Sequence, residues 1–234
     1  MLNIFNICIV LALIGYIISG CKNGVVKETA SFIGIIIVFF FSYILMGPIG
    51  NFLCTVLPFF KYRGLVSLNI LVYQAIAFSI LFCLFLVIYR LLLKISNGLQ
   101  KIVNATIILI LPSKILGGII GFIEGWITIF IILLALLVPL KDFDQYKDSK
   151  LTSYVLFNTP VLSDTVKPFT KGVIEIYDVS SKIALKEMST NEANLESINI
   201  MLKYKLVDRY TIEELVKLHK LDSVKNLEEV LKKY

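Results

Sequence analysis

Residues that soluble enzymes use for chemistry are scarce in this sequence. It has one histidine, His219, in a short charged stretch, and no Cys-x-x-Cys or Cys/His spacing typical of a metal site. Phosphate-binding, dinucleotide-binding, nucleophile-elbow and zinc-protease motifs are missing as well. A histidine-based hydrolase needs a second partner group, and none is visible. We therefore expect no enzymatic activity, no cofactor and no metal site.

Charged side chains are also scarce over most of the chain. Residues 1–140 contain two acidic residues, and 57% of the whole sequence is hydrophobic, whereas about 45–50% is usual for soluble domains. A helix of about 20 apolar residues crosses a bilayer. Four stretches are long and apolar enough to be such spans: 1–21, 29–46, 64–89 and 113–140.

Short segments connect these spans. Residues 22–28 are predicted to be a polar connection, and Gly47-Pro48 is predicted to end the second span because proline blocks helix continuation. The third span is expected to continue as a helix over 90–101. Residues 102–111 are apolar but too few to cross, so we expect an interfacial or re-entrant segment there. Ser113 is predicted to cap the fourth span.

The fold class that follows is all-α: an integral membrane four-helix bundle with a small helical C-terminal soluble tail. The predicted domains are a four-span transmembrane domain (1–140), a linker with an amphipathic juxtamembrane helix (141–190) and a small helical C-terminal domain (191–234).

The region after the spans is predicted in more detail from its charges and apolar spacing. Residues 141–150 alternate in charge and are predicted to be a solvated linker. The helix after it, over 163–187, is expected to lie on the bilayer with an interruption near Pro168 and Gly172. Of three short helices in the last domain, the second is predicted to start at Thr211 with a capping box.

Net positive charge belongs to the membrane part. Residues 1–140 carry 8 Lys+Arg and 2 acids, whereas 141–234 carry 15 of each. Basic loops would meet anionic lipid headgroups, and the balanced tail gives no sign of nucleic-acid binding. Basic residues near the membrane divide six to five between the two sides, so the positive-inside rule selects no orientation. Four spans put both termini on one side, which we place in the cytoplasm.

The first span has a competing interpretation. Ile18-Ser19-Gly20-Cys21 resembles a lipoprotein cleavage box, but Met1–Asn6 has no Lys or Arg, which a signal peptide would have. Gly20 and Gly24, four residues apart, are instead typical of close helix packing. The four cysteines lie in or beside apolar segments and are interpreted as small buried hydrophobes: Cys8, Cys21, Cys54 and Cys83.

The fourth span has one face of small and polar residues. At about 100° per residue, Gly117, Gly121 and Gly125 fall together, with Lys114 and Glu124 beside them. Small residues let helices approach closely in lipid, so this face is expected to meet protein. The opposite face is bulky and is expected to meet lipid: Ile119, Phe122, Ile123, Trp126, Phe130 and Leu133.

Glu124 lies roughly 15 Å along this helix from Lys114, close to the middle of a bilayer. A carboxylate there costs at least ~2.5 kcal/mol unless it is paired, hydrated or protonated. Lys27 and Lys114 are the candidate partners.

Two motifs together resemble the colicin V production protein (CvpA) family of bacterial inner-membrane proteins over roughly residues 1–165. One is Asn23-Gly24-Val25-Val26-Lys27-Glu28, and the other is Leu116-Gly117-xxx-Gly121-xx-Glu124-Gly125. Family members commonly have Asp-Arg where this chain has Ser113-Lys114, and Arg or Lys where it has Glu124. The charge at position 124 is therefore reversed relative to those family members.

The resemblance implies a multi-pass protein of the bacterial cell (plasma) membrane that is linked to toxin (bacteriocin) production and envelope maintenance. We expect a non-enzymatic accessory or scaffold factor whose partners are the lipid bilayer and either further copies of itself or other membrane proteins. The alternative is a small oligomeric channel or transporter that uses Glu124. The helix-packing or functional candidates are Gly24, Lys27, Glu28, Lys114, Gly117, Gly121, Glu124 and Gly125.

Overall fold

The computed structural model describes residues 3–61, 64–100 and 110–234, and these are all-helical, with irregular connections between the helices. Four helices are long and apolar enough to cross a membrane, by length and composition: Ile4–Asn23, Lys27–Val56, Leu68–Leu92 and Ser113–Leu140. The last of these has the bounds predicted from the sequence. The all-α class and four candidate spans are thus confirmed.

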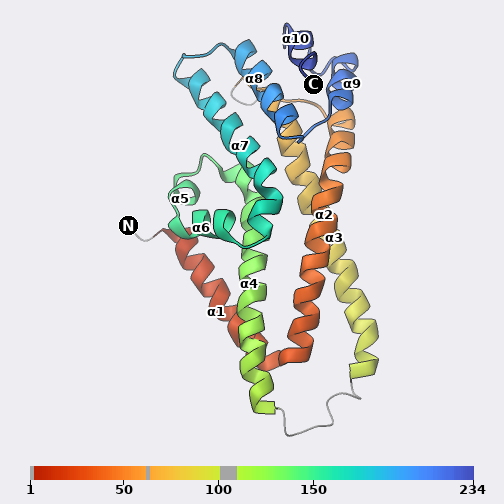
Figure 1. Cartoon of the computed structure of the whole chain (residues 1–234), viewed down its shortest axis with the longest axis vertical. Helices are drawn as coiled ribbons and strands as arrows, with labels where there is room; N and C mark the ends of the chain where they lie inside the picture. The colour runs from red at the N-terminus through yellow and green to blue at the C-terminus, as the bar shows by residue number, and fades with distance from the viewer. Residues whose placement is uncertain (1–2, 62–63, 101–109) are drawn as a thin grey trace. The chain divides into compact units, whose positions relative to one another are not determined.

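Ten helices are present in the described part of the chain (Figure 1). They are α1 (Ile4–Asn23), α2 (Val25–Val56), α3 (Leu68–Gln100), α4 (Ile110–Leu140), α5 (Asp144–Lys147), α6 (Lys150–Asn158), α7 (Leu162–Ala184), α8 (Thr190–Lys203), α9 (Arg209–Lys217) and α10 (Leu227–Leu231).

Several predicted helix ends are wrong. The polar connection at 22–28 is reduced to Gly24, the single residue between α1 and α2, with φ +77°. α2 continues through Pro48 to Val56. α4 begins at Ile110, so Pro112 lies in its first turn. Backbone N–H groups in the first turn of a helix have no acceptor within the helix, so proline, which lacks the N–H, is tolerated there. Most of the apolar stretch 102–111 falls outside the described residues.

The chain divides into two compact units, and α2, α3 and α4 each contribute to both. The first unit is Met1–Ile44, Ser79–Leu134 and Asp142–Thr159, and the second is Leu45–Phe78, Ala135–Lys141 and Pro160–Tyr234. Because packing and not a bilayer defines these units, the predicted domain boundaries at residues 140 and 190 stay a prediction.

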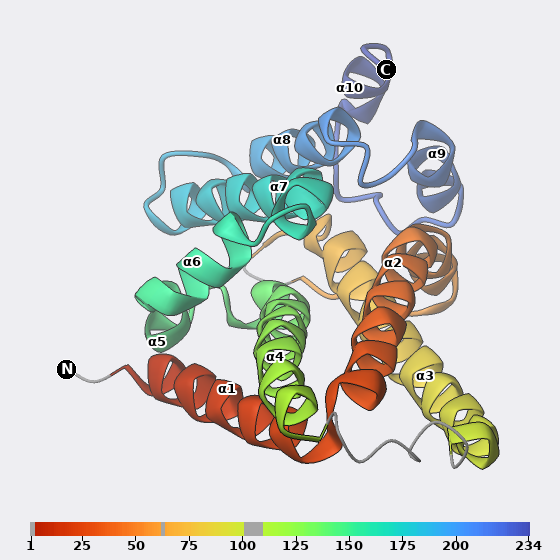
Figure 2. The ribbon, with the colours of Figure 1, turned by 60° about the horizontal axis from the view of Figure 1, so that its bottom comes forward.

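In the first unit, α1 and α4 meet at one end and diverge toward the other, where α5 and α6 lie (Figures 1 and 2). Phe39 of α2 and Phe130 of α4 are fully buried and pack edge-to-face, with ring centroids 6.0 Å apart. Tyr89 of α3 donates to the Ala30 carbonyl, beside Gly34 of α2. These aromatic contacts form the core between α2, α3 and α4.

The predicted lipid face of α4 is only half right. Ile119, Phe122 and Ile123 are exposed, as expected, but Phe130 and Leu133 are buried. Phe130 is covered by α2. Trp126 donates from its indole N–H to Thr159 Oγ1 at 2.9 Å and is therefore covered by the end of α6.

The predicted solvated linker at 141–150 is also wrong. It contains α5, whose Tyr146 is buried and donates to the Leu133 carbonyl at 2.6 Å. Burial raises the pKa of the Tyr146 hydroxyl. The cysteine interpretation fails in part as well, because Cys54 is buried but Cys8 and Cys83 are exposed.

In the second unit, α7 is one uninterrupted helix through Pro168 and Gly172. Its apolar stripe is buried inside the protein, so the expectation that this helix lies on the bilayer is wrong. A Cβ on Gly172 would lie 2.5 Å from Leu206 Cδ1, so glycine here allows close packing. The buried stripe is Val166, Phe169, Val173, Ile176 and Tyr177.

The capping box lies at α8 and not at Thr211. Ser189 and Glu192 bond each other's backbone N–H reciprocally at the start of α8. α9 begins two residues before Thr211, because Asp208 accepts the Thr211 N–H at 2.6 Å and caps the helix.

The terminal helices are tied to the long helices within the second unit. Asn194 Oδ1 accepts the N–H groups of Val66 and Ser67 at 2.9 and 3.0 Å, and its Nδ2 donates to the Gly64 carbonyl at 3.1 Å. Lys220 Nζ donates to the Cys54 and Leu57 carbonyls, both at 2.6 Å. Carbonyls that the end of α2 leaves without helix partners thus gain a cationic donor.

Candidate functional site

The backbones of α1 and α4 touch along a line of glycines. A Cβ on Gly20 would lie 2.2 Å from the Gly117 carbonyl oxygen, and one on Gly117 would lie 2.4 Å from that of Gly20. A Cβ on Gly121 would lie 2.5 Å from the Tyr16 carbonyl oxygen. Backbone atoms cannot turn aside as a flexible side chain can, so the contact requires glycine at these positions. The small face of α4 therefore packs against α1 of the same chain.

Gly24 and Ser113 complete one end of this contact. Gly24 takes a left-handed conformation that favours glycine, and its Cβ would lie 3.0 Å from Ser113 Oγ. The same hydroxyl oxygen accepts the Val25 N–H at 3.2 Å. Ser113 thus serves the start of α2, and its predicted role as the cap of α4 is wrong.

Glu28 is buried beside the glycines, with 3% of its surface exposed. Asn23 Nδ2 donates to Glu28 Oε2 at 3.0 Å. The other oxygen, Oε1, would lie 3.1 Å from a Cβ on Gly121. Glycine at position 121 therefore leaves room both for α1 and for this carboxyl group.

Glu124 is buried as well, with 5% exposed, and it meets α2. Ser31 Oγ donates to Glu124 Oε1 at 2.8 Å. Oε2 is buried and has no hydrogen-bond partner among the described residues. The group inside the protein that contacts this acid is thus a serine hydroxyl.

Neither candidate lysine has the predicted role. Lys27 is exposed and donates to Asn23 Oδ1 at 3.1 Å, while Lys114 is exposed near the start of α4. Gly125 packs on the Tyr16 side chain, because a Cβ on Gly125 would lie 2.7 Å from both Cβ and Cγ of Tyr16. The structure thus brings Gly24, Glu28, Gly117, Gly121 and Gly125 into one contact, with Glu124 one turn beyond Gly121.

Sequence reasoning missed some members of this site. The pair Gly20-xxx-Gly24 has the spacing of Gly117-xxx-Gly121, a signal that would have paired the two helices. Tyr16 and Ser31 carry no such signal, because each acts through a contact with a distant helix. Among the described residues, no three His, Cys, Asp or Glu side chains lie together as metal ligands would.

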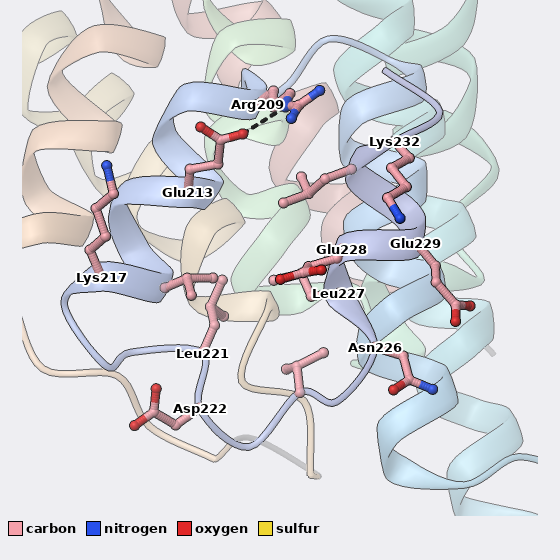
Figure 3. A pocket seen from close by; sticks show the side chains of 13 residues that line it. Arg209, Glu213, Lys217, Leu221, Asp222, Asn226, Leu227, Glu228, Glu229 and Lys232 are labelled. Carbon is pink, nitrogen blue, oxygen red and sulfur yellow. Dashed lines mark hydrogen bonds and ion pairs between the residues drawn. The ribbon is translucent and has the colours of Figure 1, made fainter.

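The C-terminal helices contain a cleft of about 790 Å³. Figure 3 shows its charged side chains, including the Arg209–Glu213 ion pair at 2.6 Å. Leu221 and Leu227 lie among them. The lining mixes both charge signs and does not select one kind of ligand.

The four apolar helices and their glycine contact define a helical membrane protein. The chain belongs to the colicin V production protein family, whose model matches residues 5–160, about two thirds of the sequence. The match contains both motifs and ends just after α6. No curated protein and no solved structure matches the chain. Family membership and the apolar helices fit a membrane protein in bacteriocin production.

Proposed function

We propose that this protein is a non-enzymatic accessory factor of the bacterial cell membrane, with both termini in the cytoplasm, that supports bacteriocin production, export or envelope maintenance. The observation that carries the proposal is the use of the motif residues. One contact among α1, α2 and α4 contains four of the motif residues: Gly24, Glu28, Gly117 and Gly121. We infer that the family motifs shape a helical scaffold.

The partners we propose are further copies of the chain or other membrane proteins. The glycine face is not available to them, because α1 occupies it. The exposed apolar side chains of α4 offer a surface instead: Ile119, Phe122 and Ile123.

A deletion strain tests the proposal. Deletion is expected to lower toxin release or raise sensitivity to detergents, and the wild-type gene is expected to restore both. Gly117→Leu should fail to restore them at equal membrane abundance, whereas Gly15→Leu should succeed, since no atom lies within 4 Å of a Cβ at Gly15. Unchanged release and envelope resistance after deletion would refute the accessory role.

One observation favours a second candidate function, a small channel or transporter. Glu124 Oε2 is buried without a hydrogen-bond partner among the described residues, in a helix that is long enough to span. Such intramembrane acids commonly mark ion or proton pathways. The test is ion and proton flux in proteoliposomes for the wild type, Glu124→Gln and a control, Asp148→Asn, at an exposed acid. This function requires flux that Glu124→Gln alone abolishes, and equal flux in all three proteins would exclude it.

A further inference from the structure

The pair α5–α6 in the first unit leaves large aromatic side chains uncovered. Tyr154 and Phe157 of α6 are 56% and 46% exposed, and Phe143, just before α5, is 50% exposed. The opposite side of α6 is buried through Val155 and Leu156. Tyr154 and Phe157 lie three residues apart, so they share one helix face. The outward side of α6 thus combines two exposed aromatic rings with polar Ser153 and Asn158, whereas a water-facing helix would be polar throughout.

The position of α5 relative to α1 places this face at a membrane surface. α1 has 20 residues, about 30 Å of helix, which just crosses the hydrocarbon core. Asn3, its N-cap, donates to the Gln145 carbonyl at 2.6 Å, and Asn6 Oδ1 accepts from Ser149 Oγ at 2.7 Å. The start of α6 therefore lies at the end of α1, where the polypeptide meets the bilayer surface.

The contacts of α5 and α6 with α4 also place the start of this helix pair near the membrane surface. Tyr146 of α5 bonds the Leu133 carbonyl, which is 16 residues, or about 24 Å, along α4 from Gly117. Gly117 in turn contacts the other end of α1 at Gly20. The Trp126 and Tyr154 rings pack edge-to-face at 6.0 Å, and Figure 1 shows α6 crosswise to α4. α6 therefore starts near the boundary, and its end contacts Trp126, which lies seven residues, or about 10 Å, further into the bilayer along α4.

A shallow groove of about 430 Å³ follows this face. Two aromatic rings line it together with charged and polar side chains: Lys147, Asp148, Ser149, Lys150, Ser153, Tyr154, Phe157 and Asn158. Charged groups beside Tyr and Phe rings match the headgroup boundary of a bilayer, where aromatic residues gather. α5 and α6 pack on α1, which also exposes apolar side chains, among them Ile7 and Leu11.

We propose that α5–α6 is an interfacial element whose aromatic face and groove are occupied by the phospholipids of the bilayer. Residues 142–159 then return to the membrane surface after the fourth span. The element anchors the start of α1 at the headgroup layer, and its last turn reaches Trp126 about 10 Å below that layer. This placement does not depend on what the protein exports or supports.

Depth-dependent fluorescence quenching in proteoliposomes of phosphatidylethanolamine and phosphatidylglycerol tests the proposal. The full chain, with its four cysteines replaced by serine, receives one cysteine at Phe157, labelled with an environment-sensitive fluorophore. An interfacial helix buries its apolar face about 5–10 Å deep. A nitroxide near the headgroup should therefore quench Phe157→Cys about twofold more than one deep in the acyl chain.

Two control sites calibrate the measurement. Leu11→Cys, on the exposed face of α1, should be quenched more strongly by the deep nitroxide. A fluorophore on Glu213→Cys, in α9, should be quenched by aqueous iodide and by neither of the two nitroxide-labelled lipids. The emission spectrum of Trp126, the one tryptophan of the chain, reports whether each variant keeps the α4–α6 contact.

The proposal is overturned if the Phe157 label, in a protein with an unchanged Trp126 spectrum, responds only to iodide, as a water-facing helix would. It is equally overturned if the label is shielded from both lipids and iodide, since a protein would then cover the face. Stronger quenching by the deep nitroxide would also reject the headgroup placement.

Discussion

Gly20 and Gly117 show how much of this protein depends on the absence of side chains. Glycine within a helix costs roughly 0.5–1 kcal/mol relative to alanine, yet α4 carries four of them between Gly117 and Gly125. In lipid, helix association depends on close packing and not on the hydrophobic effect. The backbone contact between α1 and α4 offsets that cost, because it brings van der Waals surfaces together that any Cβ would separate.

Gly117→Ala is expected to destabilise the protein, because its Cβ would lie 2.4 Å from a carbonyl oxygen that cannot rotate away. Overpacking of this kind typically costs about 1–3 kcal/mol. Titration of the purified protein in mild detergent with a denaturing detergent measures the loss. Gly15→Ala, in the open part of α1, should leave the free energy of unfolding equal or higher. Equal stability of both variants would contradict the backbone contact.

Glu124 illustrates a different residue-level point. The sequence placed an acid near mid-bilayer and offered lysines as partners, whereas the structure places Ser31 there. One hydroxyl donor satisfies one carboxyl oxygen and leaves the other buried. The group is therefore expensive to keep charged, which is why its substitution separates the two proposed functions.

Among the elements, α7 and α8 are joined by a polar contact as well as by their apolar faces. Glu175 of α7 accepts a hydrogen bond from the Tyr204 hydroxyl and another from Lys203 Nζ at 3.3 Å. The bond from Tyr204, followed by that from Lys203, holds the pKa of the Glu175 carboxyl below its usual range. The carboxylate form is thus favoured by folding.

This contact makes a small part of the stability depend on pH. A carboxyl whose pKa is lower in the folded state stabilises the protein above its unfolded pKa of about 4.3, and the contribution is lost as pH falls through the folded value. Tyr204→Phe should therefore lower the thermal midpoint at neutral pH and have less effect near about pH 3. The Glu175 side chain is 38% exposed, so solvent screening keeps the effect small.

The matched control is Tyr210→Phe, which removes a hydroxyl from an exposed tyrosine of α9. Its thermal midpoint should equal that of the wild type at both pH values. A loss in Tyr204→Phe that is the same at neutral and acidic pH would mean that ring packing, and not the Glu175 bond, is responsible.

For the molecule as a whole, the long helices do more than cross a membrane. α2 and α3 have 32 and 33 residues, about 48–50 Å of helix, against a hydrocarbon core of roughly 30 Å. Asn51 of α2 bonds Thr211 at 3.0 Å, and Gln74 of α3 donates to the Leu206 carbonyl, both inside the second unit. The C-terminal helices therefore pack on the last turns of α2 and the first turns of α3.

Four crossings predict that the segments before α1 and after α4 lie on the same side, and we propose that this side is the cytoplasm. In a cysteine-free background, a membrane-impermeant maleimide should label Lys27→Cys in intact cells. Glu213→Cys should be labelled only after lysis. An N-terminal tag that stays with the protein would also exclude cleavage before Cys21. The reverse labelling pattern would invert the orientation, and labelling of both sites in intact cells would contradict the four-span topology.

Properties that depend on neighbours along the chain were readable from the sequence. Hydropathy located the four spans, although α4 begins at Ile110, three residues before the predicted start, and glycine spacing located the small face of α4. Helical periodicity located the apolar stripe of α7, although not the protein core that covers it. These signals are local, because length, burial tendency and helix period are properties of a continuous segment.

Contacts between distant segments were decided by three-dimensional packing. Ser31 lies 93 residues from Glu124, and Ser113 lies 88 residues from the Val25 N–H that it accepts. The sequence of α5–α6 has balanced charge, which is typical of a linker. Only the structure shows that Tyr146 bonds the Leu133 carbonyl and that Trp126 contacts α6. No periodicity encodes such pairings, since each depends on where two separate helices come together, and that placement arises only when the whole chain has folded.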